Sequence, residues 1–256
     1  MSVKLKICTF NLRTPSEKDG INYFPNRKGM ILDCINKEAP DVIGFQEAPD
    51  STRDWLLDAL TDYTVIGCGR KADLSGEATL VAYKKHDFQA LSMENFWLSL
   101  APSVPGSRYG ADQSKYPRIA TAVVLKHKEA EKPFLFVNTH LDHKGSAART
   151  YGAIQILQYI DSKKLPFVLT GDLNAKHEDP EIKVLTDCAY LNVTDLTRNL
   201  EGTFHDYGRR VPNSKIDYIL TNMQGDPAEA YVVKDVTPEG VYISDHYPVF
   251  AYVNVE

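Results

Sequence analysis

The sequence predicts an α/β protein of the α+β kind, in which mixed or antiparallel sheets are covered by helices on the outside. Short apolar runs typical of strands outnumber the amphipathic segments typical of helices. Several neighbouring strand segments are separated by short polar turns, as in hairpins. With 256 residues and neither a low-complexity linker nor a clean repeat, we expect one domain over residues 1–256.

The composition is that of an ordinary soluble globular protein, with 43% hydrophobic and 25% charged residues. A net charge of −5 argues against a strong sequence-independent grip on nucleic acid, although a local basic rim could coexist with it. No apolar run suits a signal peptide or a membrane anchor. The scattered Cys8, Cys34, Cys68 and Cys188 form no Cys-x-x-Cys pair, which predicts reduced thiols in a cytoplasmic protein. We assume a monomer.

The first quarter of the chain predicts two strands and two helices. A strand over residues 4–10 delivers Asn11 at its end. A helix follows from about Asn26 to Glu38, with an apolar face at i, i+3 and i+4, and Pro40 ends it. Residues 41–47 are a short buried strand that ends in polar residues. A second helix is expected to begin at Ser51 as N-cap, with Asp54 three residues later, and to bury Trp55, Leu56, Ala59 and Leu60.

The middle of the chain changes towards a period of two residues. Strands are expected over 63–67, 78–83 and 88–97. The segment from Ser99 to Pro117 is irregular and rich in Pro, Gly and Ser. A loop of this length in a compact domain tends to be functional, with a disordered insertion as the alternative. Further strands are predicted over 118–126 and 134–143, the second with a polar end.

The last part of the chain begins with a helix capped by Ser146 and running to about Ser162, which buries Ala153, Ile156, Leu157 and Ile160. Arg149 lies at the N-terminal end of that face. Pro180 starts a short helix containing Ile182 and Leu185. Strands are predicted over 191–196, 202–207, 215–221, 229–234 and 246–253.

The stretch from Leu165 to Asn174 combines a buried strand with a polar exit. The apolar run ends at Gly171, and Asp172 and Asn174 follow at i, i+2, a spacing that points both side chains the same way in extended backbone. A carboxylate beside an amide suits a hard cation and a phosphoryl oxygen. Gly-Asp-x-Asn is also ordinary turn chemistry, so this stretch alone leaves both interpretations open.

Polar clusters recur at the ends of six apolar strand segments, and six accidents of this kind are not credible. They are Asn11; Gln46 and Glu47; Asn138, His140 and Asp142; Asp172 and Asn174; Asp217; and Asp245 and His246. Mg²⁺ takes oxygen ligands and binds through one or two carboxylates plus substrate phosphate, whereas no local His and Cys cluster suits zinc. Histidine beside an acid suits general base catalysis, and Asn, His and Arg donors suit charge on phosphoryl oxygens.

An ordered set of motifs across nearly the whole chain resembles the endonuclease/exonuclease/phosphatase superfamily. The motifs are Thr9-Phe-Asn-Leu-Arg, Gln46-Glu47, Pro117-Arg118, Asn138-Thr-His-Leu141, Gly171-Asp-Leu-Asn174, Lys215-Ile-Asp-Tyr-Ile219 and Ser244-Asp-His-Tyr-Pro-Val249. The resemblance implies a DNase I-like four-layer α/β sandwich, with two central mixed, mostly antiparallel sheets flanked by helices. It also implies Mg²⁺-dependent hydrolysis of a phosphate ester by in-line attack of water, with Mn²⁺ as an alternative metal.

The resemblance also implies roles for individual residues. Glu47 would be the main metal ligand, with Asn11 beside it and Asp245 contributing. Asp172 would orient or deprotonate the attacking water, and Asn174 would help to hold the phosphate.

The two histidines of the motifs have different implied roles. His246, paired with Asp217, would position the phosphate or act as the base, and both roles stay open. His140 would donate to a phosphoryl oxygen, and a histidine there is more similar to the sphingomyelinase and deadenylase branches than to the apurinic endonucleases.

Several residues stand beside this set. Arg118 is expected to contact an anion, and Arg149 is included among the substrate-binding candidates. Asp142 and His143 are left open, and Glu77 and His205 are interpreted as structural.

The substrate is the least determined part of the prediction. Dispersed basic residues favour a compact soluble phosphomonoester or phosphodiester, with the 99–117 loop closing one side of the cleft. The alternatives are a DNA or RNA nuclease and a non-catalytic phosphate-binding scaffold.

Overall fold

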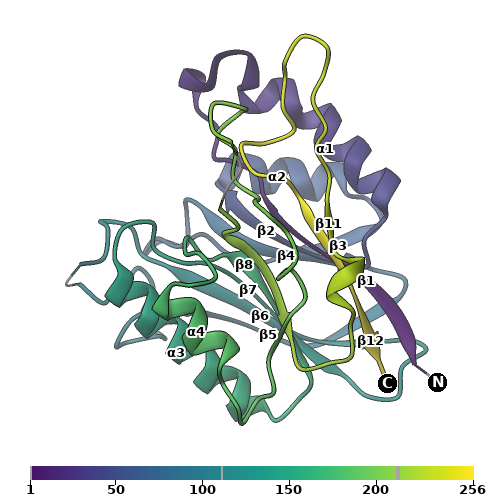
Figure 1. The fold of residues 1–256 in the computed structure, drawn as a ribbon, viewed down its shortest axis with the longest axis vertical. Helices are drawn as coiled ribbons and strands as arrows, with labels where there is room; N and C mark the ends of the chain where they lie inside the picture. Colours follow the sequence, from purple (N-terminus) through teal and green to yellow (C-terminus); the bar gives the residue numbers. More distant parts are fainter. Residues whose placement is uncertain (1, 111, 212–213) are drawn as a thin grey trace.

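The computed structural model describes residues 2–110, 112–211 and 214–256. Two six-stranded sheets pack face to face, and helices cover their outer faces (Figure 1). This is the four-layer sandwich of two mixed sheets that the resemblance implies, so that expectation is confirmed. Of the helices in these described ranges, none is long and apolar enough to cross a membrane.

The first sheet contains one parallel pair, β1 with β2, and all its other pairings are antiparallel. Its strands, in spatial order, are β11 (Tyr231–Val232), β12 (Val249–Val255), β1 (Val3–Asn11), β2 (Val42–Ala48), β4 (Ala78–Lys84) and β3 (Tyr63–Ile66).

The second sheet is built in the same way around the parallel pair β7 and β8. Its order is β5 (Phe88–Trp97), β6 (Ile119–His127), β7 (Phe134–His140), β8 (Phe167–Asp172), β10 (Asp217–Thr221) and β9 (Thr194–Asp195). Within a parallel pair both strands end at the same edge, so both pairs deliver their last residues to one end of the sandwich.

Each parallel pair is joined through a helix and followed by a second one. In the first sheet these are α1 (Phe24–Glu38) and α2 (Asp50–Ala59), and in the second they are α3 (Ser146–Lys163) and α4 (Pro180–Thr186). The order strand–helix–strand–helix therefore occurs twice, although the sequence contains no clean repeat. Two 3₁₀ segments, η1 (Glu17–Asn22) and η2 (Pro227–Glu229), complete the helical elements of the described residues.

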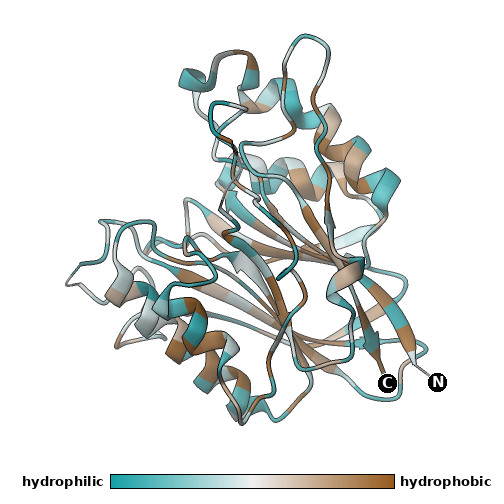
Figure 2. Cartoon of the chain, viewed as in Figure 1, coloured by the Kyte–Doolittle hydropathy of each residue, from teal (hydrophilic) through white to brown (hydrophobic). Residues whose placement is uncertain are grey.

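The apolar core consists of one layer between the sheets and one layer under the helices on each side. Ile7 and Phe136 lie in the central layer; Ile31 of α1 packs in the same outer layer as Phe45 of β2, and Ile156 of α3 belongs to the outer layer on the other side. The strands of both sheets are mostly hydrophobic, whereas the outer helices carry mixed colours (Figure 2). The four residues predicted to be buried on α3 are all in this core.

The predicted N-cap of the second helix is wrong. The helix begins at Asp50 with Pro49 as its cap residue, and Ser51 is an exposed residue inside it. Pro49 has the extended backbone of a cap position, and its carbonyl accepts the N–H of Thr52 and of Arg53. Trp55 and Ala59 are only partly buried.

In the last quarter, the strand predicted over 202–207 is wrong, and the strands predicted over 191–196 and 229–234 are too long. Phe204 makes a single bridge to His246, while Asp206 and Tyr207 have φ of 50° and 55°, which extended backbone does not allow. The segments at 191–196 and 229–234 shorten to β9 and β11. The last strand begins at Val249 rather than at residue 246, which leaves Asp245 and His246 in a loop.

A polar network joins the two sheets below the rim where the parallel strands end. Gln46 Nε2 on β2 donates to Thr9 Oγ1 (3.0 Å) and to Asn138 Oδ1 on β7 (2.7 Å). Asn138 Nδ2 donates back to the carbonyl oxygens of Phe45 (2.8 Å) and Leu80 (2.9 Å). These contacts fix the first sheet against the second directly beneath the polar residues at the rim.

Candidate active site

Polar residues from both sheets converge on one cavity of about 440 Å³ at the rim of the sandwich. Its lining residues come from strand ends and from the loops around them: Arg13, Thr14, Glu47, Arg70, Glu77, Tyr116, Arg118, His140, His143, Asp172, Asn174, Phe204, Asp206, Arg210, Ile216, Asp245 and His246. The separate clusters of the sequence therefore meet in space.

Glu47 projects from a bulge in β2, where the register with β4 shifts between Phe45 and Ala48. Its φ of 58° is uncommon for a residue other than glycine, and such local strain is typical of functional sites. The carboxylate accepts hydrogen bonds from Asn11 Nδ2 (3.3 Å) and from the Thr14 N–H (2.8 Å). The bulge redirects this side chain, and the two donors fix it.

Asp172 ends β8 at the centre of the cluster. Its carboxylate accepts hydrogen bonds from Asn11 Nδ2 (3.0 Å) and from the Asn174 N–H (2.9 Å). Burial raises the pKa of Asp172 to about 7; the charge of His246 opposes this rise and that of Asp217 adds to it. A carboxyl group with such a pKa can exchange a proton near neutrality.

His246 and Asp217 form a buried pair, with 2.9 Å between Nδ1 and Oδ2. Burial opposes the charged imidazole, but attraction to Asp217 and to Asp172 outweighs it, so the pKa of His246 is well above its usual range. Nε2 lies 3.7 Å from Asp172 Oδ2. The arrangement therefore favours the charged imidazole of His246.

His140 lies on the other side of Asp172, with Nε2 at 3.5 Å from Oδ2. Burial, followed by the positive charges of Arg118 and Arg70, holds the pKa of His140 well below its usual range. A neutral imidazole can donate one hydrogen bond without adding a charge.

Asp245 adds a third buried carboxyl group. Burial raises its pKa to about 6, His246 opposes the rise, and Glu47 adds to it. Arg13 Nε lies 3.7 Å from Asp245 Oδ2, and Arg13 also pairs with Asp19 at 3.2 Å.

The donor set fits a hard divalent cation. Ligand atoms of Glu47, His140 and Asp172 lie within 4.8 Å of one another, as do those of Asp172, Asp217 and His246. Repulsion between Glu47 and both buried aspartates contributes to their raised pKa values, and a cation would relieve that repulsion.

Asn11 is oriented differently from a metal ligand. Its amide nitrogen faces Glu47 and Asp172, while Oδ1 accepts the Arg13 N–H at 2.9 Å. This arrangement favours a brace between two carboxylates over the predicted place in the coordination sphere.

The two predicted arginines lie in different surroundings. Arg118 lines the cavity. Arg149 does not line it, because its guanidinium pairs with the buried Glu181 and donates from Nη1 to the Asp142 carbonyl oxygen at 3.0 Å. Arg149 therefore joins α3 to α4, and the geometry does not support a substrate contact.

Arg70 is a cavity residue that the sequence interpretation missed. It follows β3 in a loop, outside every strand-end motif, and no pattern in the sequence marks it. Phe204, whose ring packs beside His246, and Arg210, which lies over Phe204, also line the cavity and were not identified as site residues. Only the adjacent pair of arginines at 209 and 210 could have indicated this part of the cavity.

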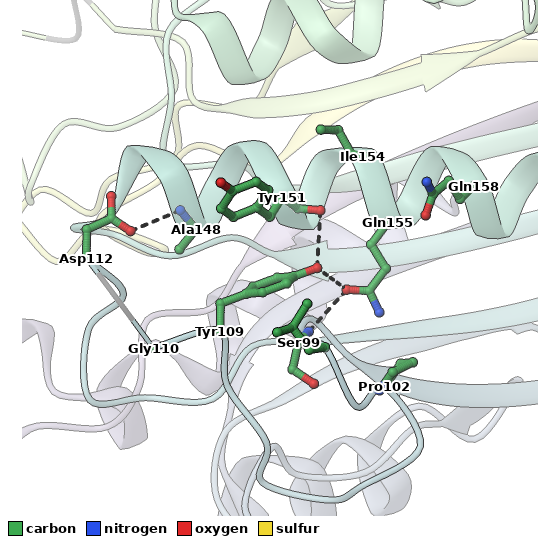
Figure 3. A pocket seen from close by; sticks show the side chains of 11 residues that line it. Ser99, Pro102, Tyr109, Gly110, Asp112, Ala148, Tyr151, Ile154, Gln155 and Gln158 are labelled. Carbon is green, nitrogen blue, oxygen red and sulfur yellow. Dashed lines mark hydrogen bonds between the residues drawn. The ribbon is translucent and has the colours of Figure 1, made fainter.

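A larger cavity of about 650 Å³ lies elsewhere, in a groove between α3 and the 99–117 loop (Figure 3). Gln155 Oε1 accepts hydrogen bonds from the Tyr109 hydroxyl (2.5 Å) and the Ser99 N–H (3.1 Å), while Asp112 accepts the Ala148 N–H (3.1 Å). No group from the carboxylate cluster reaches this groove, and its size does not make it the reactive site.

The protein is an α/β sandwich of two mixed sheets, and the shared rim of the sheets gathers carboxylates, imidazoles and arginines around a small cavity. The sequence profile of the Endonuclease/Exonuclease/phosphatase family matches residues 8–246, and the chain belongs to that family. The family is metal-dependent, and the protein is a hydrolase of phosphate esters.

Three relatives illustrate the likeness. An uncharacterized protein of Acanthamoeba polyphaga mimivirus is 27% identical over 157 residues, and the match spans 58% of each protein. A family member of Bacteroides thetaiotaomicron is 26% identical with a TM-score of 0.90, over 100% of this chain and 99% of that one. A mannosyl-6-phosphatase of the same organism is 26% identical with a TM-score of 0.85, over 98% and 100%.

Proposed function

We propose that this protein is a Mg²⁺-dependent phosphoesterase, with Mn²⁺ as an alternative, that hydrolyses a small soluble phosphate ester by in-line attack of water. The observation that carries this proposal is the cavity itself. Within it, carboxylates lie together with three histidines and four arginines around a space of about 440 Å³. Such an arrangement is suited to a hydrated cation and one phosphoryl group.

Glu47 and Asp172 would hold the metal with His140 beside them, and Asp245 would be an outer ligand. Bound there, Mg²⁺ supplies charge neutralisation and polarises a phosphoryl oxygen. Asn11 keeps the two inner carboxylates at a fixed spacing through its amide nitrogen.

In the reaction, Asp172 accepts a proton from the attacking water while the water oxygen forms a bond to phosphorus. The P–O bond to the leaving group breaks on the opposite side, and the departing alkoxide takes a proton from solvent. Cationic His246 donates from Nε2 to a phosphoryl oxygen, which favours the positioning role over the base role. Neutral His140 donates to another phosphoryl oxygen, and Asn174 contributes its remaining amide hydrogen.

A small substrate agrees with three observations. The cavity has the size of a small-ligand site, the net charge of −5 opposes a long polyanion, and one relative is named a mannosyl-6-phosphatase. Sugar phosphates are therefore the first substrates to test. We also propose one domain and a cytoplasmic location, in line with four free cysteines.

The test is hydrolysis of mannose 6-phosphate, p-nitrophenyl phosphate and single- and double-stranded DNA and RNA, each with Mg²⁺, Mn²⁺ or EDTA. Asp172→Asn should reduce kcat about 10²- to 10⁴-fold. The exposed Asp187→Asn is the matched control and should retain full activity. Metal-dependent cleavage of polynucleotides without cleavage of small esters would contradict the small-substrate proposal. Absence of any metal-dependent cleavage would contradict phosphoesterase activity altogether.

A further inference from the structure

Arg70 and Arg118 form one wall of the cavity, beside His140 and Glu47. Their exposed fractions are only 8% and 4%. They come from separate loops, one between β3 and β4 and the other at the start of β6. Two buried guanidinium groups next to a candidate reaction centre require anionic partners.

The wall is rigid around Arg118. Nε lies 3.2 Å from Asp142 Oδ2, and Nη2 lies 2.8 Å from His143 Nδ1. Asp142 also accepts hydrogen bonds from the N–H groups of Ser114 (3.1 Å) and Gly145 (2.9 Å). These bonds fix the carboxylate, which in turn holds Arg118 in place. Asp142 and His143, whose roles the sequence left open, are thus positioning residues for this guanidinium.

The third nitrogen of Arg118 has no acceptor. Nη1 is buried and has no hydrogen-bond partner within the described part of the chain. A buried charged donor without an acceptor is unfavourable, and buried groups of this kind are rare in folded proteins. Arg118 lines the cavity and is clamped at Nε and Nη2, so Nη1 is the nitrogen left to pair with an anion bound against this wall.

Arg70 supports the same position. Its Nη1 lies 2.9 Å from Glu77 Oε2, and its guanidinium lies 4.6 Å from the centre of the Tyr116 ring. Tyr116 belongs to the 99–117 loop and lines the cavity, so this loop reaches the wall. Glu77 was interpreted as structural, and its contact with Arg70 agrees with that role.

The donors beside Asp172 and along the cavity therefore belong to three groups: His246, His140, and the arginine wall that lines the cavity with His140. A phosphomonoester presents three terminal oxygens and nearly two negative charges near neutral pH. A phosphodiester presents two terminal oxygens and one charge, and its second ester group takes the third position.

We infer that the arginine wall makes this protein a phosphomonoesterase, in which Arg118 Nη1, supported by Arg70, binds the third terminal oxygen of the phosphoryl group. A diester would place an alkyl group against this wall and leave the buried donor without an acceptor. The inference rests on the proposed function, because it assigns a substrate class to the same cavity. The reaction converts the monoester and water into an alcohol and inorganic phosphate.

The experiment compares p-nitrophenyl phosphate with methyl p-nitrophenyl phosphate, two esters with the same leaving group, at one Mg²⁺ concentration. For each variant, kcat/KM is divided by the wild-type value for the same ester, so intrinsic reactivities cancel. Arg118→Met and Arg70→Met should lose about ten- to a hundredfold more activity on the monoester than on the diester. Arg210→Met, which removes a cavity arginine that lies over Phe204 and outside the arginine wall, should lower kcat/KM for both esters equally.

Equal losses on both esters in the Arg118 and Arg70 variants would overturn the inference and leave the proposed function intact. No metal-dependent hydrolysis of either ester by the wild-type protein would instead overturn the proposed function.

A second measurement separates recognition from folding, because Arg118→Met could disturb the 99–117 loop through Asp142. Binding of inorganic phosphate in the presence of Mg²⁺, measured by calorimetry, should weaken at least tenfold in Arg70→Met, which does not contact Asp142. Thermal melts establish that the variants are folded. Unchanged phosphate affinity in a folded Arg70→Met protein would also overturn the inference.

Discussion

The two histidines beside Asp172 favour different charge states, cationic for His246 and neutral for His140, because their neighbours differ. His246 faces Asp217 at 2.9 Å, whereas His140 faces two arginines. The same side chain therefore serves as a fixed cation on one side and as a neutral donor on the other.

Asp217→Asn should move the alkaline limit of activity to lower pH. Attraction to Asp217 is the largest effect that raises the pKa of His246, so its removal lowers that pKa and the imidazolium is lost sooner as the pH rises. We expect the alkaline limb of kcat/KM to shift by about one pH unit or more, since one unit corresponds to about 1.4 kcal/mol. Profiles from pH 5.5 to 9.5 measure it. An unshifted limb with a lower plateau would contradict a cationic role for His246.

His205 should contribute a pH-dependent part of the stability. The Gly208 N–H donates to Nδ1 (3.1 Å), so the folded imidazole is neutral, and burial lowers its pKa from 6.5 to about 4. Between these values the unfolded state binds more protons, so this contribution is complete above pH 6.5 and is lost as the pH falls towards 4.

Urea unfolding at pH 4.5 and 7 measures this effect. Between pH 7 and pH 4.5, the unfolding free energy of His205→Gln should fall by about 1 to 2 kcal/mol less than that of the wild type. The exposed His86→Gln is the control, and parallel curves for wild type and His205→Gln would refute the assignment.

The sequence predicted most individual site residues because they stand in motifs at strand ends. Glu47, Asp172 and His246 line the cavity, where the motifs placed them. Arg70 could not be predicted, since a loop arginine outside any motif shows no pattern. Arg149 was predicted to bind substrate because it lies at the N-terminal end of α3. In the structure its guanidinium instead forms an ion pair with the buried Glu181. The rotamer of Asn11 is equally invisible in a sequence.

At the scale of elements, the contact between the sheets is close beneath the cavity. A Cβ atom added at Gly44 on β2 would lie 2.3 Å from Thr170 Oγ1 and 2.6 Å from Asn138 Oδ1. Both neighbours belong to strands of the other sheet and take part in the network with Gln46. The glycine therefore sets how closely the two sheets approach.

Gly44→Ala should lower the unfolding free energy by about 2 to 4 kcal/mol, because overpacking separates the sheets and breaks the hydrogen bonds around Asn138. Gly29→Ala is the matched control: Gly29 lies within α1 and nothing lies within 4 Å of an added Cβ. That variant should gain about 0.5 to 1 kcal/mol. Denaturant titration measures both changes, and a neutral Gly44→Ala would refute the close packing.

Helices and strands were predicted correctly where hydrophobic residues recur with a regular period, and incorrectly where the chain forms loops. The range of β5 and the buried face of α3 were predicted correctly, because alternation and helical spacing are strong signals. In the last quarter, apolar residues such as Tyr207 and Ile243 are buried although they belong to loops. Burial there reflects tertiary packing around the cavity and produces an apolar run without a strand.

At the scale of the whole molecule, the clustered carboxylates link stability to metal. Burial and mutual repulsion raise the pKa values of Asp172 and Asp245 to about 7 and about 6, so both carboxylates are unfavourable in the metal-free state at high pH. Acids with raised folded-state pKa values destabilise the fold progressively as the pH rises through that range.

Mg²⁺ should therefore raise the melting temperature, and more at pH 8 than at pH 5.5. At a hundredfold excess over Kd the gain is about 2.7 kcal/mol, or roughly 5 to 10 °C for a chain of this size. Glu47→Gln should melt higher than the wild type in EDTA and respond little to Mg²⁺. The exposed Glu178→Gln should behave as wild type. Calorimetric melts test this, and equal Mg²⁺ responses in both variants would contradict metal binding by Glu47.

The pairing of β1 with β12 has a consequence for biosynthesis. Val3 lies opposite Val255, so the first strand meets its antiparallel neighbour only after the chain up to Val255 has left the ribosome. Until then β1 exposes an unpaired edge next to β2. Contacts so distant in sequence are slow to form, so we expect the pairing of β12 with β1 to be a late step of folding.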